Sequence, residues 1–360
     1  MRNLCLSILV LTLVWTVSAG GATAITWTIE SVDTTPYAYQ GVELTLDTAG
    51  RPHASYGSFG FGMRYAYRDG SGWHQETIEG AGGVGYSDTA LVLDGAGQPH
   101  ISYYDYTHGL LKYAYYAGTA WVTATVDTCM GDTALVLAAN QPRIAYFGPG
   151  NHLNYAHLAG GTWYTETVAS SAEIAGPLAL VLDSGDEPHI LYQLDGLRYA
   201  YHDGTGWHSE VVDSYAAGGD LVLDSLDQPR ASFAGFCEGG GVGPWGLCYA
   251  YRDGGGWHIA SVDVSGDTGW YSSLALDTGD HPHISYYAFA NQDLHYAAIS
   301  GTVWLTETVD SQQAGLYSAL AVAGSGRVHI AYEGDSTLKY AFGVGAEAAY
   351  QVYLPRIERW

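Results

Sequence analysis

Aromatic and acidic side chains recur between the predicted strands of this 360-residue chain, and together they could bind a sugar. Aromatic rings stack on the apolar faces of sugars, and carboxylates accept hydrogen bonds from sugar hydroxyls. The alternative is that many of these rings pack in the core. The candidate ligand-binding residues are Tyr37, Tyr39, Tyr86, Asp88, Tyr104, Asp105, Tyr106, Trp245, Asp267, Trp270, Tyr271 and Tyr317. Further acids in the same predicted loops are Asp132, Asp293, Glu333 and Asp335.

Paired carboxylates about 5–10 Å apart could also support glycoside hydrolysis. Asp88 with Asp105 or Asp132 is a conceivable pair, but many other acids compete and none is singled out. The sequence holds no GxSxG, HExxH or phosphate-binding loop motif. No catalytic residue is therefore predicted. A polysaccharide hydrolase or lyase remains an alternative to non-catalytic binding.

Histidine recurs at one position of a repeated Pro-His-Ile-Ser-Tyr block. Four of these histidines follow an Asp by one short turn, as Asp47 precedes His53 and Asp277 precedes His283. The set is His53, His100, His189, His283 and, by position, His329. Equivalent positions in a ring of repeats are too far apart to form one tetrahedral metal site, so we expect structural Asp–His hydrogen bonds instead. No metal or other cofactor is predicted; the acidic charge could attract calcium, but no loop has ordered calcium-ligand spacing.

A Trp-x-x-Glu motif admits two interpretations. The glutamate could be an edge-strand charge that prevents pairing with another sheet. It could also belong to a repeated sugar pocket made of a Trp, an acid and an Arg. The glutamates are Glu30, Glu76, Glu166, Glu210 and Glu307. Cations share one strand position at Arg64, Lys112, Arg198 and Lys339, but Asn154, Cys248 and His295 replace them elsewhere, so the pocket set is incomplete.

The elements that must position these residues are repeated β-strands. A Trp recurs at intervals of 42 to 50 residues, at Trp27, Trp73, Trp121, Trp163, Trp207, Trp257 and Trp304. Between successive Trp residues the same four short blocks return, each rich in Val, Ile, Tyr or Trp and bounded by Gly, Pro, Asp or Asn. Four strands per repeat are typical of one β-propeller blade. The sequence therefore predicts an all-β, seven-bladed β-propeller of four-stranded antiparallel blades.

The two ends of the repeat predict how the ring closes. The last unit lacks its Trp strand, and the first Trp strand has no blade before it. The N-terminal strand should therefore complete the seventh blade as its outermost strand. The expected blades are 41–79, 87–126, 132–168, 177–212, 219–262, 272–309, and 318–342 with 26–32.

Composition excludes several classes of partner. The chain has 37 acidic residues against 13 Lys and Arg, a net charge of −24. Nucleic acid and anionic membranes both require basic patches, so neither is an expected partner. The first 24 residues pair Arg2 with an apolar run from Leu4 to Val17 and a small-residue exit, the pattern of a secretory signal peptide. We expect residues 1–24 to be removed, 25–343 to form the propeller and 344–360 to form a C-terminal tail.

No second apolar run is long enough to span a membrane, so the mature protein is expected to be secreted or held at the cell surface. In an oxidising compartment Cys237 and Cys248 are candidates for a disulfide around a Gly-rich loop. Cys129 is left over, and we expect it to be a buried, unreactive side chain.

The repeat resembles the secreted bacterial propeller-repeat proteins that are grouped with the sialidase-like and seven-bladed lectin propellers. The resemblance covers about residues 26–342 and implies the fold; propellers host many functions, so it leaves the function open. The leading hypothesis is a non-catalytic module that binds glycans or another extracellular polymer. The alternatives are a polysaccharide hydrolase or lyase and an extracellular scaffold for protein partners.

Overall fold

The computed structural model describes residues 25–35, 39–58, 60–80, 84–170, 176–238, 241–311 and 313–344. All of the regular elements in these ranges are β-strands, arranged as seven antiparallel sheets of four strands. The predicted signal peptide and all but the first residue of the predicted tail lie outside these ranges. Within them, no helix is long and apolar enough to cross a membrane.

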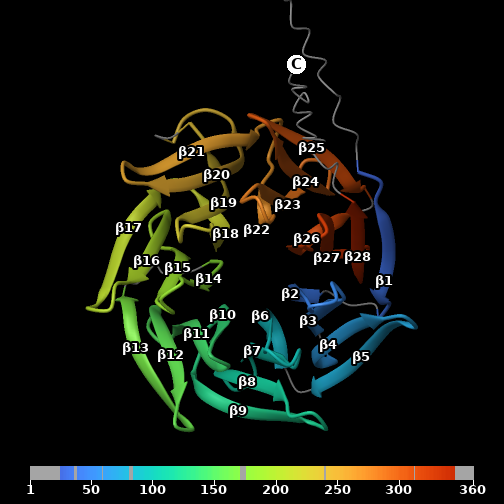
Figure 1. Ribbon diagram of the computed structural model, residues 1–360, viewed down its shortest axis with the longest axis vertical. Helices are drawn as coiled ribbons and strands as arrows, with labels where there is room; N and C mark the ends of the chain where they lie inside the picture. The colour runs from blue at the N-terminus through green and yellow to red at the C-terminus, as the bar shows by residue number, and fades with distance from the viewer. Residues whose placement is uncertain are drawn as a thin grey trace, which may run out of the picture.

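The seven sheets are the blades of a ring (Figure 1). Blade 1 contains β2 (Tyr39–Leu46), β3 (Pro52–Ser58), β4 (Gly62–Asp69) and β5 (Gly72–Glu79). Blade 2 contains β6 (Val84–Leu93), β7 (Pro99–Asp105), β8 (Leu110–Tyr116) and β9 (Trp121–Thr128). Blade 3 contains β10 (Thr133–Ala138), β11 (Gln141–Gly148), β12 (His152–Ala159) and β13 (Thr162–Ser170). Blade 4 contains β14 (Ala179–Leu182), β15 (Pro188–Gln193), β16 (Leu197–His202) and β17 (Trp207–Asp213). Blade 5 contains β18 (Ala217–Leu223), β19 (Pro229–Phe236), β20 (Trp245–Asp253) and β21 (Gly256–Asp263). Blade 6 contains β22 (Trp270–Leu276), β23 (Pro282–Ala288), β24 (Asp293–Ser300) and β25 (Val303–Asp310).

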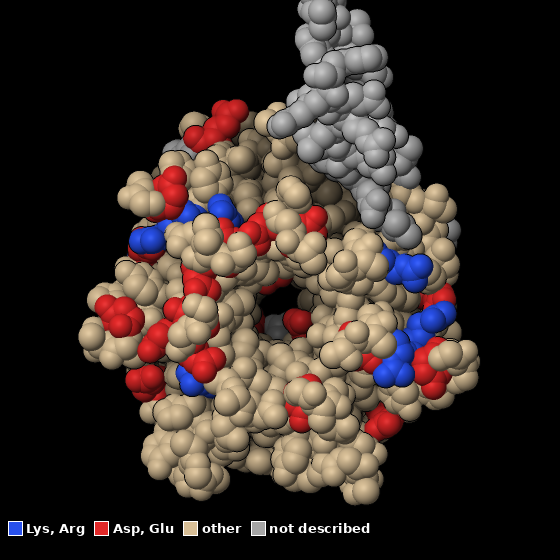
Figure 2. Space-filling view, in the orientation of Figure 1, with Lys and Arg blue, Asp and Glu red and all other residues tan. Residues whose placement is uncertain are grey.

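Blade 7 closes the ring as predicted. It contains β26 (Ala314–Val322), β27 (Arg327–Gly334), β28 (Thr337–Val344) and, as its outermost strand, β1 (Thr28–Asp33). The register pairs Thr28 with Phe342 and Ile29 with Ala341. The first strand of every blade faces the centre of the ring, where Figure 2 shows an opening. Hydrogen bonding between β1 and β28 therefore closes the ring of blades.

Small side chains allow the blades to pack closely, and some of them also bond across the gap. Ser55 and Ser102 on second strands are fully buried, as is Ala145 at the same position. Hydroxyl pairs then join neighbouring blades, at Ser55–Thr89 (3.0 Å), Ser102–Thr133 (2.9 Å), Ser232–Ser272 (3.0 Å) and Ser285–Ser318 (2.9 Å). Each pair satisfies two polar groups that would be costly to bury alone.

A carboxylate at the end of each of five outer strands locks that blade to the next; we call this contact the interblade latch. The carboxylate accepts a hydrogen bond from a second-strand tyrosine of the following blade. The five bonds run from Tyr56 to Asp33 (3.0 Å), Tyr103 to Glu79 (2.5 Å), Tyr146 to Asp127, Tyr286 to Asp263 (2.7 Å) and Tyr332 to Asp310 (2.9 Å). Cations strengthen three latches, at Arg64–Asp33 (3.1 Å), Lys112–Glu79 (3.5 Å) and Lys339–Asp310 (3.1 Å). Three of the four cations considered for a repeated sugar pocket are thus held in latches.

The predicted Asp–His hydrogen bond is wrong, because the imidazole is bonded to a tyrosine instead. In five blades Nδ1 of the histidine pairs with a third-strand tyrosine hydroxyl, as in His283–Tyr296 (2.5 Å) and His329–Tyr340 (2.5 Å). The Asp lies 3.6 to 3.8 Å from Nε2 in four of these blades, which is too long for a hydrogen bond. The Asp instead caps its own turn, as Asp47 does for the backbone N–H groups of Ala49 and Arg51.

The glutamates of the Trp-x-x-Glu motif contact the next blade. In three places the indole N–H of the following Trp donates to them, at Trp27–Glu307 (3.0 Å), Trp73–Glu30 (3.1 Å) and Trp121–Glu76 (2.7 Å). Arg68 also donates to Glu30 from Nε (2.8 Å) and Nη2 (2.9 Å). These contacts give the outer rim of the ring a second set of bonds between blades.

Candidate functional site

The two ends of each blade are built differently, and the candidate site lies at one of them. We call the end that carries the turns between first and second strands and between third and fourth strands the hairpin end. The opposite, loop end carries the second-to-third-strand loops and the connections to the next blade. Among the predicted site residues, Tyr37 lies outside the described residues. Tyr39, Tyr86 and Asp88 lie in β2 and β6, but their side chains are outside the description.

Two tryptophans stack at the loop end where blade 5 meets blade 6. The ring centroids of Trp245 and Trp270 are 5.8 Å apart with planes inclined by 27°. Phe236 packs edge-on against Trp245 at 5.2 Å. The exposed carboxylate of Asp267 accepts a hydrogen bond from the indole N–H of Trp270 (2.6 Å). Both tryptophans are partly exposed, so this cluster presents aromatic surface beside a carboxylate.

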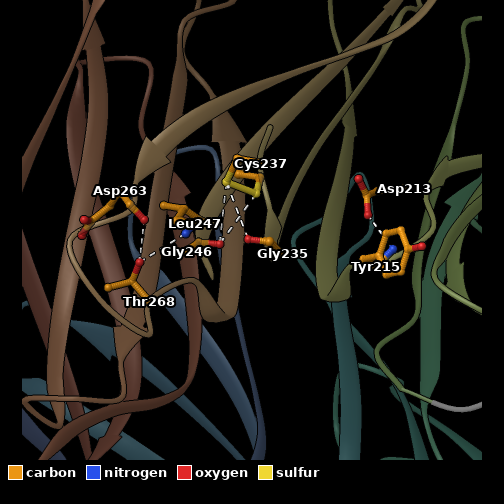
Figure 3. The surroundings of a disulfide bond; sticks show 9 residues. Asp213, Tyr215, Gly235, Cys237, Gly246, Leu247, Asp263 and Thr268 are labelled. Atoms are coloured by element: carbon orange, nitrogen blue, oxygen red, sulfur yellow. Dashed lines mark hydrogen bonds between the residues drawn. A yellow bond between two sulfur atoms is a disulfide. The ribbon is translucent and has the colours of Figure 1, made fainter. Parts of the chain in front are cut away.

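A disulfide and a hydroxyl bridge hold the backbone next to the two tryptophans, and Figure 3 shows both of these links. The Cys237–Cys248 disulfide, with Cα atoms 5.3 Å apart, closes the loop from which Trp245 emerges. The backbone N–H of Leu247 donates to Oγ1 of Thr268 (3.2 Å), and that hydroxyl donates to the carbonyl of Asp263 (2.6 Å). Leu247 follows Trp245 by two residues, and Thr268 precedes Trp270 by two. The hydroxyl bridge therefore fixes both tryptophans at the same point of the rim.

Two tyrosines in blades 6 and 7 are held in an unfavourable backbone conformation. Tyr271 and Tyr317 each have a φ of 51°, and their ring centroids lie 4.7 Å apart. Glycines occupy the equivalent positions in blades 1 and 5, Gly41 (φ 63°) and Gly218 (φ 73°). A left-handed conformation costs a non-glycine residue about 1–2 kcal/mol. Oγ of Ser318 donates to the carbonyl of Tyr271 (3.0 Å) and helps to hold it.

These rings form two contact clusters over blades 5, 6 and 7, which meet where Trp270 pairs in register with Tyr287. Tyr271 is 41% exposed and Phe289 is 57% exposed, whereas Tyr287 beneath them is buried. Tyr287 contacts both Tyr271 (6.3 Å between centroids) and Phe289 (5.9 Å). We define the aromatic patch as Phe236, Trp245, Trp270, Tyr271, Tyr287, Phe289 and Tyr317. The structure therefore brings together four of the predicted rings, Trp245, Trp270, Tyr271 and Tyr317, with the predicted acid Asp267.

A buried carboxyl group lies beside this patch. Glu333, at the loop end of β27, pairs in register with Leu316, the residue before Tyr317. It is 8% exposed, and burial raises its pKa to about 7. A carboxyl group with this pKa exchanges a proton near neutral pH, which is a property of general acids and bases.

The predicted residues of blade 2 are separate from the patch. Tyr104 and Tyr106 contact each other edge-on at 6.1 Å, and Tyr106 is 64% exposed. Asp105 is buried and accepts hydrogen bonds from the backbone N–H (3.2 Å) and Nδ1 (2.7 Å) of His108. Asp105 therefore stabilises its own loop.

Neither a metal cluster nor a reactive thiol stands out in the described part of the chain. These ranges contain no group of three or more His, Cys, Asp or Glu side chains that could hold a metal ion. Cys129 is buried, burial raises its pKa to about 12, and its Sγ donates to the carbonyl of Gly131 (3.1 Å). A thiol with this pKa is a poor nucleophile.

Comparison with known proteins identifies the fold. No protein-family model matches the chain, and a search of curated proteins also gives no match. Among solved structures, a catalytically inactive virginiamycin B lyase from Staphylococcus aureus with quinupristin superposes with a TM-score of 0.63 at 7% identity, over 88% of this chain and 99% of that one. A polysaccharide lyase, ulvan lyase bound to -[GlcA(1-4)Rha3S]-, gives 0.58 at 13% identity, over 88% and 96%. The Aleuria aurantia lectin in complex with Fucα1-6GlcNAc gives 0.51 at 14% identity, over 78% and 98%.

Proposed function

We propose that this protein is a secreted or cell-surface β-propeller that binds glycans at the aromatic patch without catalysing a reaction. The observation that carries the proposal is the partly exposed Trp245–Trp270 pair with Asp267 at its edge. Indole faces suit the apolar faces of pyranose rings, and the second oxygen of Asp267 can accept a hydrogen bond from a sugar hydroxyl.

The strained tyrosines support the same assignment. Blades 1 and 5 place glycine where blades 6 and 7 place Tyr271 and Tyr317, so the propeller does not need a side chain there. Strain that the fold does not require tends to mark functional positions. The two rings extend the stacking surface from the tryptophans toward blade 7. Aromatic rings on three adjacent blades suit a glycan of several sugar units.

The lectins among the structural neighbours support a glycan ligand only at the level of the fold. Two such neighbours are lectins in complex with Fucα1-6GlcNAc and with α-methyl fucoside. Their identity to this chain is 14% or lower, so the identity of the sugar is left to experiment.

The proposal is tested by truncating one indole. Trp270→Ala should weaken binding of a glycan that the protein captures on an array by about 5- to 150-fold, since a stacked aromatic contributes about 1–3 kcal/mol. Isothermal titration calorimetry measures this change. Tyr164→Ala is the matched control. Tyr164 is an exposed tyrosine on the outer strand of blade 3, whereas the aromatic patch lies on blades 5, 6 and 7. Equal affinity of Trp270→Ala and the unmodified protein would contradict the proposal.

A lyase or hydrolase is the second candidate, and Glu333 is the observation that favours it. Its raised pKa would allow it to exchange a proton with a glycan on the patch at neutral pH. Incubation of a bound glycan with the protein, followed by mass spectrometry, distinguishes the two candidates. Cleavage that is lost in Glu333→Gln would establish catalysis; an intact glycan supports binding alone. Capture of a protein but no glycan would favour a scaffold.

A further inference from the structure

A second pocket lies at the hairpin end, where the closing blade 7 meets blade 1. It has a volume of about 380 Å³ and is open to solvent. Blade 1 contributes its two hairpin turns, with Arg51, Arg68 and Asp69, and blade 7 contributes Arg327, His329, Tyr340 and Phe342. The carboxylate of Asp69 accepts hydrogen bonds from the backbone N–H and the hydroxyl of Ser71 in its own turn. Figure 2 shows Lys and Arg side chains gathered over this part of the ring, between β28 and β5. Three of the 13 Lys and Arg residues of a chain of net charge −24 thus converge on one pocket.

The three guanidinium groups keep donors available for a ligand. Arg51 binds Asp47 through Nε (2.6 Å), and Arg68 binds Glu30 through Nε and Nη2, which leaves other N–H groups on each. Arg327 is exposed and lies over the ring of Phe342, 5.4 Å from its centroid. Within the described ranges it makes no ion pair with a carboxylate. The aromatic ring of Phe342 holds the guanidinium of Arg327 in place, and the N–H groups at the edge of this guanidinium remain available.

His329 adds an unpartnered polar atom to the pocket. It is 3% exposed, its Nδ1 is bonded to the Tyr340 hydroxyl, and its Nε2 is buried without a hydrogen-bond partner. Burial, reinforced by the charge of Arg327, lowers its pKa to about 4, so the imidazole is neutral at physiological pH. A buried polar atom without a partner is costly, and a ligand atom can satisfy it.

The repeat itself indicates which chemical group belongs beside this nitrogen. In blades 1, 2, 4 and 6 a carboxylate oxygen lies 3.6 to 3.8 Å from Nε2 of the equivalent histidine, in electrostatic contact but beyond hydrogen-bond distance, and Nε2 of His189 also has no hydrogen-bond partner. That carboxylate comes from the Asp of the turn before the second strand. Blade 7 has Ala323 at this position. The carboxylate is therefore missing in the one blade whose histidine lines an arginine-rich pocket.

We propose that this pocket binds the carboxylate of an acidic sugar residue such as a hexuronate, with the ligand supplying the group that Ala323 omits. Guanidinium groups recognise carboxylates through paired hydrogen bonds, and Arg327 is free to make them. The pocket volume suits one or two sugar units, and Phe342, which lines the pocket, contributes apolar surface. The site lies at the opposite end of the blades from the aromatic patch and does not depend on it.

The test is a calorimetric titration with digalacturonate, with neutral digalactose as the matched probe. We expect the unmodified protein to bind digalacturonate at least ten times more tightly than digalactose. Arg327→Ala should weaken digalacturonate binding at least tenfold. Ala323→Asp should do the same, because it restores the internal carboxylate found in four other blades and so should not disturb the fold. Circular dichroism and thermal unfolding of both variants confirm that the propeller is intact.

Three controls make the outcomes decisive. Ser325→Asp adds the same charge at an exposed position of the same hairpin and should change affinity by no more than about twofold. Tyr164→Ala, on the outer strand of blade 3, should leave digalacturonate binding unchanged, whereas loss of that binding in Trp270→Ala would place the sugar at the aromatic patch and overturn the proposal. Equal affinity for digalacturonate and digalactose, or retained affinity in Ala323→Asp and Arg327→Ala, would overturn the proposal. Equally tight binding of acetate or sulfate would also overturn it, because the site would then recognise a small anion and no sugar.

Discussion

The hairpin end and the loop end of the same seven blades follow different rules. At the hairpin end the residues repeat from blade to blade and bond to one another, as the five His–Tyr pairs do. At the loop end the interblade latch repeats, but the loop residues vary, and stacked aromatic rings gather over blades 5 to 7. Residues that repeat therefore maintain the ring, and positions that depart from the repeat are where we place function. Ala323 follows the same rule at the hairpin end, since it departs from the repeat.

The largest effect should come from a residue of the interblade latch. Asp33→Ala removes the partner of both Tyr56 and Arg64 at the point where β1 closes the ring. Breaking a buried ion pair on one side costs about 3–5 kcal/mol, so the free energy of unfolding should fall by that amount. Urea unfolding measures it. Asp267→Ala, an exposed acid of the patch, should change stability by less than about 0.5 kcal/mol. Equal losses in the two variants would refute the distinction between the repeated acids that hold the ring together and the acids of the aromatic patch.

An intermediate effect should come from Glu333, and it should depend on pH. Its pKa of about 7 in the folded protein is above the ordinary value, so the folded state loses stability as pH rises from about 4.5 through 7. Glu333→Gln removes this loss. The variant should be more stable than the unmodified protein by up to about 3 kcal/mol at pH 8 and by less than about 1 kcal/mol at pH 5. Thermal unfolding at the two pH values checks this, and a difference that does not change with pH would show that Glu333 is not a buried acid.

The smallest effect on stability should come from the strained tyrosines. Tyr271→Gly relieves a left-handed conformation worth about 1–2 kcal/mol, so stability should stay constant or rise although a contact is lost. Tyr164→Gly, in the regular strand β13, should instead lose about 1 kcal/mol. Glycan affinity should fall in the first variant only. A stability loss in Tyr271→Gly as large as that in Tyr164→Gly would mean that the side chain of Tyr271 stabilises the fold.

The sequence predicted the architecture well because the repeat encodes it seven times. The recurring Trp marks the outer strand, and the unpaired strands at the two ends predict the β1–β28 closure that the structure contains. The latch was missed, although a signal exists: an acid follows the apolar residue of the Trp strand at Asp33, Glu79, Asp127, Asp213, Asp263 and Asp310. A partner in the next blade cannot be inferred from residues that lie 19 to 24 positions away in the chain without the packing of the ring.

The candidate site was only partly predictable. Loop topology placed Trp245 and Trp270 at the same end of the ring, but their stacking depends on the hydroxyl bridge through Thr268. The left-handed backbone conformation of Tyr271 and Tyr317 cannot be predicted from the residue type, because tyrosine rarely adopts it. The pocket at Arg327 was missed because Arg51 and Arg327 are 276 positions apart and meet only when the ring closes.

The central claim is that the aromatic patch binds glycans, and the most direct measurement is a glycan array. The unmodified protein and the double variant Trp245→Ala/Trp270→Ala should be screened in parallel, each with and without EDTA. The account predicts that the unmodified protein captures a set of glycans, that EDTA leaves this capture unchanged, and that the double variant loses it while remaining folded. Capture of the same glycans by the double variant would place the binding site elsewhere on the propeller and contradict the account.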